Sequence, residues 1–570
     1  MNDPPTDAAR GLERWVPGVR AVRTYDRDWL RSDIVAGLVL AAILVPQGMA
    51  YAELAGLPAV TGLYTTVACL IGYAVFGPSR VLVLGPDSSI SPLIFAAITP
   101  LLVSGGDPGR AVALAGMLAV LVGLVEVAMG VGRLGFVADL LSSEVQIGYM
   151  NGLAITIIVG QLPKLCGFST DAEGFVHEVR AFVDHIDETS AATLAMGVAV
   201  LAVLLILPRI TRRIPAVLVA VVGATVVTGV FGLAEHGVAV VGALPKGVPA
   251  PSLPWTKFAD VGPLLVAAAG ITLVSLTDTI ATSSSFAARR GDDVDPDQEM
   301  IGIGAANVAA GFFQGFAIST SGSRTAVAEQ SGAKSQLTGL VGAAIVVTLL
   351  VVFNSLLADL PQTALAAVVI AAALSLADLG VLRRFWKVRP TAVILSLVAT
   401  IGVVLFGVLQ GIAIAIVLAI LLFFRRSWWP HGTVLGRVDG VDGWHSLEQR
   451  PDGAELDDVV VFRWEAPLFF ANAGAFRRQL RQFVRDRHPR WIVLQCEAIT
   501  DVDVTAADML ERLDKELNEG GVHLAFVELR ERLRDLLLDY GLLEVLDQGH
   551  FYGTIDEALA AIATEDEGPR

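Results

Sequence analysis

The first 430 residues contain about fourteen long apolar runs, and this feature restricts the fold more than any other. A helix needs about 20 predominantly apolar residues to cross the roughly 30 Å hydrocarbon core of a bilayer. The runs lie at residues 33–52, 58–77, 86–103, 110–130, 136–160, 190–207, 214–232, 263–286, 299–316, 322–333, 336–353, 361–378, 391–407 and 409–425. We therefore predict a multi-pass α-helical membrane protein.

Composition and charge divide the chain into two parts. It is 54% hydrophobic and 17% charged, whereas soluble domains carry about 25% charged residues, so it is not soluble along its whole length. Residues 431–570 contain 28 acidic and 15 basic side chains, while the preceding part is nearly neutral. An acidic soluble module thus follows the membrane module, and this charge argues against nucleic acid as a partner.

The basic residues predict the orientation of the spans. With a cytoplasmic N-terminus, the cytoplasmic loops hold twelve Lys and Arg residues and the opposite loops hold five. This asymmetry follows the positive-inside rule and places both termini in the cytoplasm. The first thirty residues are polar and Arg-rich, which is not typical of a cleavable signal peptide. The high content of Ala, Val, Gly and Arg indicates a bacterium, and hence its cytoplasmic membrane.

Two of the apolar runs are interrupted. Val81–Leu84 has the pattern of a short strand and is followed by Gly85–Ser91, which is rich in Gly, Pro and Ser. Gly315–Ile318 is likewise followed by Ser319–Thr325. These third and tenth runs occupy corresponding positions in two halves of seven, which indicates a midplane site in an inverted-repeat transporter. Two half-helix N-termini that converge there would bind an anion.

The last part has the pattern of a small soluble α/β domain. Buried strands are expected at residues 459–462, 491–494 and 522–526, with amphipathic helices at 473–486 and 506–519. The Gly- and Asp-rich stretch 437–453 is typical of a linker or of an opening hairpin. No metal or catalytic pattern accompanies it, because Cys69, Cys166 and Cys496 lie far apart and the eight His residues lack HExxH spacing. We expect neither an enzyme nor a cofactor.

Several motifs connect both parts to a known family. They are Leu44–Ala52 (LVPQGMAYA), Gly85–Ser88 (GPDS), Gln161–Gly167 (QLPKLCG), Ser323–Ala326 (SRTA), Pro467–Asn472 (PLFFAN) and Asp501–Thr505 (DVDVT). Through these residues the chain resembles the SulP family of anion transporters (sulfate permeases) with a C-terminal STAS domain. The resemblance extends over roughly residues 15–560.

This resemblance implies a seven-plus-seven inverted repeat that is divided into core and gate bundles. The anion would lie between the two half-helices, the core would move like an elevator, and the chain would form a homodimer with cytoplasmic α/β STAS domains. The expected parts are a cytoplasmic N-terminal segment (1–30), a transmembrane anion transport domain (31–427), a linker (428–453), the STAS domain (454–565) and a tail (566–570).

Asp278 is the main candidate for ion coupling. It lies in a long apolar run, and a charge at the bilayer centre costs several kcal/mol, so an intramembrane carboxylate indicates a function. The alternative is a purely structural carboxylate that is hydrogen-bonded to helix ends. The resemblance implies proton or sodium coupling, with Thr282 as a hydroxyl ligand. Sodium-coupled relatives have a Thr where Gly322 aligns, which favours a proton.

Asp87 and Arg324 bring charge to the two interrupted segments. Asp87 either caps its half-helix or titrates during transport. Arg324 either offsets the negative charges of the anion and of Asp278 or pairs structurally with an acid. The remaining predicted substrate-binding residues, for which ordinary helix packing is the alternative, are Gln47, Tyr51, Ser88, Ser89, Ser321, Gly322 and Ser323.

Two features of the soluble part suggest regulation or lipid contact. Thr505 follows Asp503 at a position where related STAS proteins carry a phosphorylatable hydroxyl, and the alternative is a Thr N-cap. The arginines between Arg477 and Arg490 form either a solvated helix face or a contact with anionic lipid or the membrane domain.

These observations together predict a secondary active transporter of a small oxyanion, with sulfate as the expected substrate and a proton as the expected co-ion. Bicarbonate or a dicarboxylate, and sodium in place of the proton, are alternatives within the family. A different class would be a membrane-embedded STAS signalling scaffold that binds an anion without moving it. The intact helix breakers at residues 85–91 and 319–325 favour transport.

Overall fold

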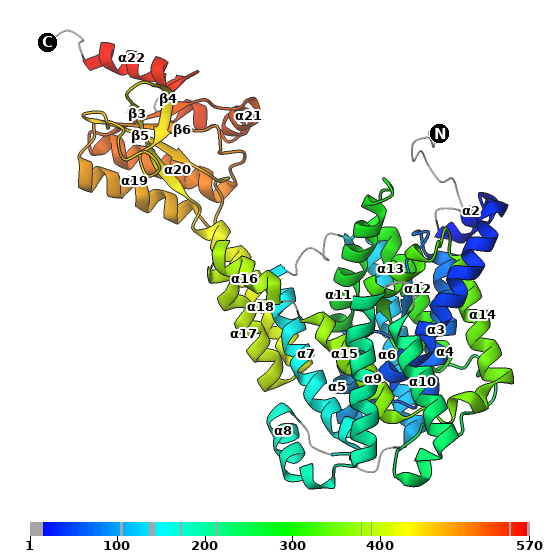
Figure 1. Ribbon diagram of the computed structural model, residues 1–570. Helices are drawn as coiled ribbons and strands as arrows, with labels where there is room; N and C mark the ends of the chain where they lie inside the picture. The colour runs from blue at the N-terminus through cyan, green and yellow to red at the C-terminus, as the bar shows by residue number, and fades with distance from the viewer. Residues whose placement is uncertain are drawn as a thin grey trace. The chain divides into compact units, whose positions relative to one another are not determined.

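The computed structural model describes residues 15–102, 107–135, 143–170, 174–211, 215–377, 379–388, 390–546 and 549–566. The chain separates into two compact units, Met1–Ala419 and Ile420–Arg570, which are described separately below. In Figure 1 the first unit consists mainly of helices, whereas the second combines helices with a six-stranded sheet. The helix α18 (Val408–Trp428) crosses the boundary between them.

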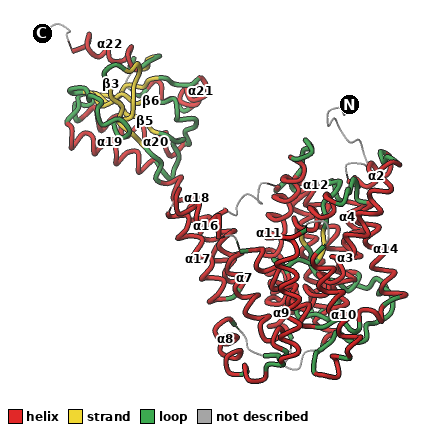
Figure 2. Tube along the Cα trace, viewed as in Figure 1, coloured by secondary structure: helices red, strands yellow, loops and turns green. Residues whose placement is uncertain are grey.

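Each of the fourteen predicted apolar runs contains a helix (Figure 2). Besides α18 these are α3 (Leu30–Leu54), α4 (Ala59–Phe76), α5 (Ser91–Ile98), α6 (Pro108–Val131), α7 (Ser143–Cys166), α9 (Ala191–Ile210), α10 (Ala216–Phe231), α11 (Phe258–Ala288), α12 (Pro296–Phe312), α13 (Gly322–Gln330), α14 (Leu337–Val352), α15 (Gln362–Leu376) and α17 (Pro390–Phe406). Seven described helices are long and apolar enough to cross a membrane. Among the described residues of the first unit, three further α-helices were not predicted: α2 (Pro17–Arg23), α8 (Phe175–Asp184) and α16 (Leu379–Val388).

The membrane helices pack as two groups. In the first group α12 lies against α6 and α4, and α14 lies against α3. In the second group α7 lies against α17 and α15, and α9 lies against α15 and α10. The close approach of α6 and α12 depends on glycine, because a Cβ on Gly123 or Gly304 would collide with the facing backbone of α12 or α6. Small residues at such crossings let membrane helices pack without a hydrophobic driving force.

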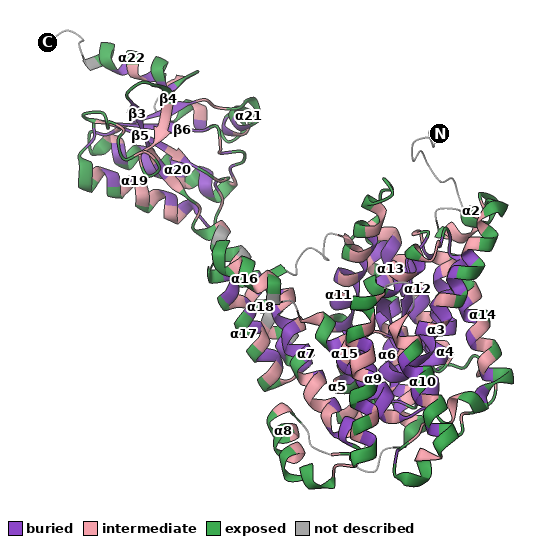
Figure 3. Cartoon of the chain, viewed as in Figure 1, coloured by how far each residue is buried: buried purple, intermediate pink, exposed green. Residues whose placement is uncertain are grey.

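Burial in the first unit follows the pattern expected of a protein in lipid. Figure 3 shows buried residues in the interior of the helix assembly and exposed residues on its outer faces. The exposed residues include large apolar side chains such as Phe231, Val266 and Leu405, which are 67%, 77% and 58% exposed. Apolar side chains on the outer surface are stable against hydrocarbon but not against water.

The two interrupted segments pair with each other. Strand β1 (Leu84–Gly85) and strand β2 (Ser319–Thr320) form an antiparallel ladder with Leu84 opposite Thr320. The predicted extended runs at 81–84 and 315–318 were therefore placed several residues too early. The strands form where the two interrupted segments meet, and the helix-breaking residues Gly85 and Ser319 belong to these strands. Irregular backbone at this depth is stable because it is buried within protein.

The second unit contains a six-stranded sheet in the order β4-β3-β5-β6-β7-β8. Its strands are β3 (Gly432–Val438), β4 (Val441–Ser446), β5 (Val459–Trp464), β6 (Trp491–Gln495), β7 (His523–Val527) and β8 (Phe551–Tyr552). Its helices are α19 (Ala473–Arg487), α20 (Val504–Glu519), α21 (Glu531–Asp539) and α22 (Ile555–Asp566). The strands β5 to β8 are parallel, and β6 is buried along its whole length, as a parallel strand covered on both faces requires.

The linker predicted at 428–453 is wrong for most of its length. Strands β3 and β4 form a hairpin there, and β3 pairs antiparallel with β5 from Gly432 to Leu435. Of the two interpretations open for residues 437–453, the hairpin is the one that forms. The hairpin is stabilised because β3 forms hydrogen bonds with the edge of β5. The composition of residues 437–453 alone does not reveal that this edge is available.

Candidate functional site

Two short helices begin at the paired strands and form the centre of the candidate site. The helix α5 follows β1 after a turn, and α13 follows β2 directly. Two hydrogen bonds join the segments across the pair: the Ser321 N–H donates to the Val83 carbonyl at 3.2 Å, and the Val83 N–H donates to Thr325 Oγ1 at 3.1 Å. Because first-turn N–H groups have no intrahelical acceptor, the helix start at Gly322 and Ser323 can bind an anion.

A cavity of about 1230 Å³ lies against these helix starts. All eleven candidate residues of the membrane part line it: Gln47, Tyr51, Asp87, Ser88, Ser89, Asp278, Thr282, Ser321, Gly322, Ser323 and Arg324. Gly322 and Ser323 are exposed within it, whereas Ser88 and Ser89 are almost fully buried. The structure therefore brings together residues from α3, the two interrupted segments and α11.

Arg324 connects the two interrupted segments. Its side chain is 1% exposed, and Nη1 donates to the Pro86 carbonyl at 2.7 Å. Nη2 lies 3.5 Å from both the Gly85 carbonyl and Asp87 Oδ1. A Cβ on Gly85 would lie 2.9 Å from Nη1, so glycine permits this approach. Of the two roles open for Arg324, structural pairing with an acid is present in the structure, and the partner is Asp87.

Asp87 forms local hydrogen bonds before the first turn of α5. Its Oδ2 accepts from the Ser89 N–H at 3.0 Å and from the Ser89 hydroxyl at 2.8 Å. Its carbonyl accepts from the N–H and the hydroxyl of Ser91 at 3.0 and 2.8 Å. The N-cap of α5 is Ile90 and no side chain caps it, so the capping interpretation of Asp87 is wrong. The Asp87 carboxylate instead holds the turn before α5 and forms an ion pair with Arg324.

The hydroxyl of Ser89 links Asp87 to Asp278. Ser89 Oγ lies 3.1 Å from Asp278 Oδ2 and 2.8 Å from Asp87 Oδ2. A serine hydroxyl has one hydrogen, so it can donate to only one of two ionised carboxylates. Among the described residues, no basic side chain forms an ion pair with Asp278. The cluster therefore holds two carboxyl groups and one guanidinium, and one extra proton would balance its charge.

Gln146 is a contact of Asp278 that the sequence reasoning missed. Its side-chain Nε2 donates to Asp278 Oδ1 at 3.3 Å from α7. Asp278 lies on α11, which packs against α6 in the first group, whereas α7 belongs to the second group. The coupling candidate is therefore hydrogen-bonded to both helix groups. A lone Gln near the start of a span gave no signal of this contact.

Glu126 and Asn307 form a second buried polar pair behind the site. Both side chains are 0% exposed, and Asn307 Nδ2 donates to Glu126 Oε2 at 2.7 Å. Asn307 Oδ1 accepts from the Ile318 N–H at 2.8 Å, which holds the chain just before β2. The sequence signal was available, because Glu126 is an intramembrane carboxylate like Asp278.

The C-terminal end of α9 (Pro208–Thr211) and the start of α10 also line the cavity. Outside the set of lining residues, Lys164 Nζ lies 3.6 Å from Glu53 Oε2. These two residues lie near the last turns of α7 and α3, so the ion pair joins the two helix groups.

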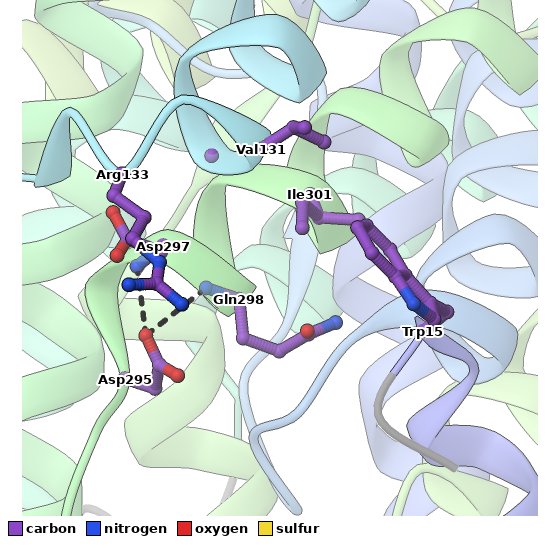
Figure 4. Close-up of a pocket in the computed structure, with 8 residues that line it drawn as sticks. Trp15, Val131, Arg133, Asp295, Asp297, Gln298 and Ile301 are labelled. Atoms are coloured by element: carbon purple, nitrogen blue, oxygen red, sulfur yellow. Dashed lines mark hydrogen bonds between the residues drawn. The ribbon is translucent and has the colours of Figure 1, made fainter. Parts of the chain in front are cut away.

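A smaller cavity of about 350 Å³ lies apart from the candidate residues (Figure 4). It lies at the C-terminal end of α6 and the start of α12, and Trp15, Arg133, Asp295 and Gln298 are among its lining residues. Asp295 accepts hydrogen bonds from the N–H groups of Asp297 and Gln298, as an N-cap does. Asp295 therefore has a structural role at the start of α12, and its presence in the lining of this cavity needs no ligand to explain it.

Thr505 lies in the second unit, and the N-cap interpretation of this residue is wrong. The cap of α20 is Asp503, whose Oδ1 accepts from the Ala506 N–H at 2.8 Å. Thr505 is therefore in the first turn, and it is exposed. The helix begins two residues earlier than a Thr505 cap requires, because Asp503 already accepts from a free N–H group of the first turn. In the described part of the chain, no group of His, Cys, Asp and Glu could hold a metal ion.

Known proteins resemble this chain in both of its units. Residues 30–399 match the sulfate permease family and residues 450–558 match the STAS domain. A probable sulfate transporter of Mycobacterium tuberculosis is 40% identical over 550 residues, which cover 96% of this chain and 98% of that protein. Human solute carrier family 26 member 6 is 31% identical over 82% of this chain and 64% of its own length.

Solved structures show the same fold. Murine solute carrier 26 family member A9, an anion transporter in the inward-facing state, superposes with a TM-score of 0.88 at 24% identity, covering 99% of this chain and 97% of that chain. The transmembrane domain of the cyanobacterial bicarbonate transporter BicA gives 0.61 at 22% identity, covering 70% and 98%. The chain therefore belongs to the sulfate permease family of membrane anion transporters and carries a C-terminal STAS domain.

Proposed function

We propose that this chain takes up sulfate across a bacterial cytoplasmic membrane by elevator-type alternating access, as a homodimer with both termini in the cytoplasm. The observation that carries the proposal is the cavity in which the start of α13, the Ser88–Ser89 turn and Asp278 lie together. A probable sulfate transporter at 40% identity supports the choice of anion. The positive-inside asymmetry of the loops supports the orientation.

The first two N–H groups of α13 and the nearby hydroxyls would bind the anion. Gly322 and Ser323 present N–H groups at the positive end of the helix dipole, and Ser321 and Ser88 add hydroxyl donors. Arg324 contributes positive potential, although its guanidinium already contacts Asp87 and the Pro86 carbonyl. Gln47 and Tyr51 line the facing side of the cavity on α3.

The hydrogen bonds that link Asp87, Ser89 and Asp278 support a proton as the co-ion. With a proton on Asp278, its O–H donates to Ser89 Oγ, and the Ser89 hydroxyl donates to Asp87. Both hydroxyl hydrogens of this network then have one acceptor each. The charges of Asp87 and Arg324 cancel, so the anion meets a neutral cluster. Release of this proton leaves two carboxylates next to the site and repels the anion. Anion and proton would therefore enter and leave together.

The two helix groups support the elevator movement. Contacts between the two groups include the Gln146–Asp278 hydrogen bond and the Glu53–Lys164 ion pair. A sliding step breaks both of these contacts without unfolding either group. The cavity is lined in part by the end of α9 and the start of α10, whose connecting loop carries basic residues and is expected in the cytoplasm.

Reconstitution tests the proposal. The purified full chain would be placed in liposomes, and uptake of labelled sulfate would be measured under an inward proton gradient, with and without sodium. We expect uptake that follows the proton gradient and does not require sodium. If unlabelled bicarbonate or a dicarboxylate inhibits the uptake of labelled sulfate at a lower concentration than unlabelled sulfate does, that anion is the substrate instead of sulfate. Binding of sulfate without flux would favour the signalling scaffold.

Two variants separate coupling from binding. Asp278→Asn keeps the hydrogen-bonding shape but carries no titratable group, so we expect gradient-driven accumulation to disappear while sulfate–sulfate exchange persists. Undiminished accumulation in this variant would rule out Asp278 as the coupling residue. A chain without residues 431–570 tests the scaffold: flux that survives the deletion assigns transport to the membrane unit alone.

A further inference from the structure

The helix α16 has one basic side and one apolar side. Its sequence, Leu379–Val388, contains no acidic residue. At 3.6 residues per turn, its three basic residues fall within an arc of roughly 100°, and Val381, Leu382, Phe385, Trp386 and Val388 occupy the remainder. A short helix of this kind lies in the plane of the membrane interface rather than across it.

Five of the described side chains of α16 are exposed: Arg383, Arg384, Trp386, Lys387 and Val388. Arg383, Arg384 and Lys387 are exposed, and among the described residues no acidic side chain forms an ion pair with them. Trp386 and Val388 are 67% and 73% exposed although they are apolar. An exposed Trp next to basic residues is typical of the boundary between headgroups and acyl chains.

The direction of two neighbouring helices places α16 on one membrane face. Gly148 of α7 faces Ser396 of α17, and Gly152 faces Thr400, so the two helices run parallel. The helix α16 precedes α17, whereas α8 follows α7. The two short helices therefore lie at opposite membrane faces, and the positive-inside rule assigns α16 to the cytoplasmic one.

The helix α8 provides an internal comparison. It follows the fifth apolar run and α16 follows the twelfth, so they occupy equivalent positions in the two halves, and each has 10 residues. Yet α8 carries Glu178 and Asp184 besides Arg180, and Arg180 pairs with Asp184 at 3.8 Å. Only the helix at the cytoplasmic face has an uncompensated positive side.

We infer that α16 is a binding site for anionic phospholipid of the cytoplasmic leaflet. The apolar side enters the acyl region next to α17, and Arg383, Arg384 and Lys387 contact headgroup phosphates. Charge complementarity identifies the occupant, because the cytoplasmic leaflet carries the anionic lipids that attract juxtamembrane basic clusters. Guanidinium groups bind phosphate oxygens with paired hydrogen bonds, which favours a phosphodiester over a diffuse counterion.

Lipid retention by the purified full chain tests this inference. Detergent micelles would contain equal amounts of dioleoylphosphatidylglycerol and dioleoylphosphatidylcholine, and native mass spectrometry would count the lipids that stay bound. We expect the wild type to retain phosphatidylglycerol preferentially. The triple variant R383Q/R384Q/K387Q should lose this preference, with affinity reduced roughly fivefold for each base removed. Equal phosphatidylglycerol retention by the triple variant would overturn the inference.

A matched control removes the same charge elsewhere. Arg477, Arg478 and Arg485 lie on α19 of the second unit, and their change to Gln also removes three positive charges. We expect this variant to keep the phosphatidylglycerol preference, and loss of the preference would assign lipid binding to net charge or to α19. The charge-conserving variant R383K/R384K should retain most of the bound lipid, which distinguishes loss of charge from loss of fold.

A second measurement places the helix in the bilayer. The described cysteines Cys69, Cys166 and Cys496 are all buried, so a bimane label on Val388→Cys reports on α16. In phosphatidylcholine liposomes with one quarter phosphatidylglycerol, we expect quenching by nitroxide-labelled lipid and little quenching by aqueous iodide. Dominant iodide quenching would show that α16 stands away from the membrane and would overturn the inference.

Discussion

The two interrupted segments are equivalent in topology but not in chemistry. The first, around β1 and α5, supplies an acid and hydroxyl groups: Asp87, Ser88 and Ser89. The second, around β2 and α13, supplies the base Arg324 and two first-turn N–H groups. The apolar helix α5 is largely buried, whereas Gly322 and Ser323 at the start of α13 are open to the cavity. One segment therefore carries a titratable carboxyl group, and the other carries the exposed helix start that we propose binds the anion.

This difference shows how a repeat can produce an asymmetric site. The strand pair keeps both segments at the same depth, with Leu84 opposite Thr320. The ion pair between Arg324 and Asp87 then joins the base of one half to the acid of the other. An anion next to α13 is not repelled by Asp87, because that charge is already compensated. The following variants test this asymmetry, from the largest expected effect to the smallest.

Arg324→Ala should have the largest effect. It removes the cation from Asp87 and leaves a buried carboxylate and the Pro86 carbonyl without their partner. Breaking a buried ion pair on one side costs about 3–5 kcal/mol, so we expect a clearly lower melting temperature and loss of sulfate uptake. Thermal unfolding and liposome flux measure the two effects. The double variant D87N/R324A should recover much of the stability, and no recovery would contradict the pairing.

Asn307→Ala should weaken the second segment specifically. The change removes the acceptor of the Ile318 N–H and the donor to Glu126. Leaving a buried polar group without a partner costs about 1–3 kcal/mol. Because Asn307 acts through the chain before β2, we expect the KM for sulfate to rise more than kcat falls. An unchanged KM together with an unchanged melting temperature would show that this pair does not position α13.

Glycine substitutions compare the two segments directly. A Cβ on Gly85 would lie 2.9 Å from Arg324 Nη1, whereas a Cβ on Gly322 has no atom within 4 Å. We expect Gly85→Ala to cost about 1–3 kcal/mol through overpacking, and Gly322→Ala to stay within about 0.5 kcal/mol. Melting temperatures in the same detergent measure both. Equal decreases in melting temperature for the two variants would contradict the asymmetry between the two segments.

Thr505→Glu should have the smallest effect. Thr505 is exposed in the first turn of α20, where added negative charge interacts favourably with the helix dipole by about 0.3–1 kcal/mol. If Thr505 is a regulatory site, as the resemblance to STAS proteins implies, the rate of uptake changes while the KM for sulfate does not. Thr505→Val controls for loss of the hydroxyl. A changed KM would mean that the second unit affects the half-helix site itself.

Much of the site could be predicted from local sequence. The breakers at Gly85–Ser91 and Ser319–Thr325 marked both half-helices, and Asp278 stood out as a carboxylate in an apolar run. Each of these signals depends on a few neighbouring residues. The contacts of Gln146 and Arg324 could not be predicted in the same way, because their partners lie 132 and 238 positions away in the chain.

The errors in prediction have the same origin. The strands at 84–85 and 319–320 form where two distant segments meet, so hydropathy alone placed them too early. The hairpin of β3 and β4 replaces the predicted linker because β5 offers an edge to Gly432–Leu435. The Thr505 cap was wrong for a more local reason, because Asp503, two residues earlier, is the N-cap and accepts from the Ala506 N–H.

The sequence by itself determined that this chain is a multi-pass membrane protein with two interrupted spans, an intramembrane acid and a soluble α/β part. Span length, helix breaking and the cost of charge in hydrocarbon are properties of short stretches of chain. Only the tertiary structure decided that Arg324 pairs with Asp87, that Ser89 bridges Asp87 and Asp278, and that Gln146 joins them from the second helix group. These choices depend on which helices pack together, and a hydrogen bond forms only where that packing brings donor and acceptor within about 3 Å.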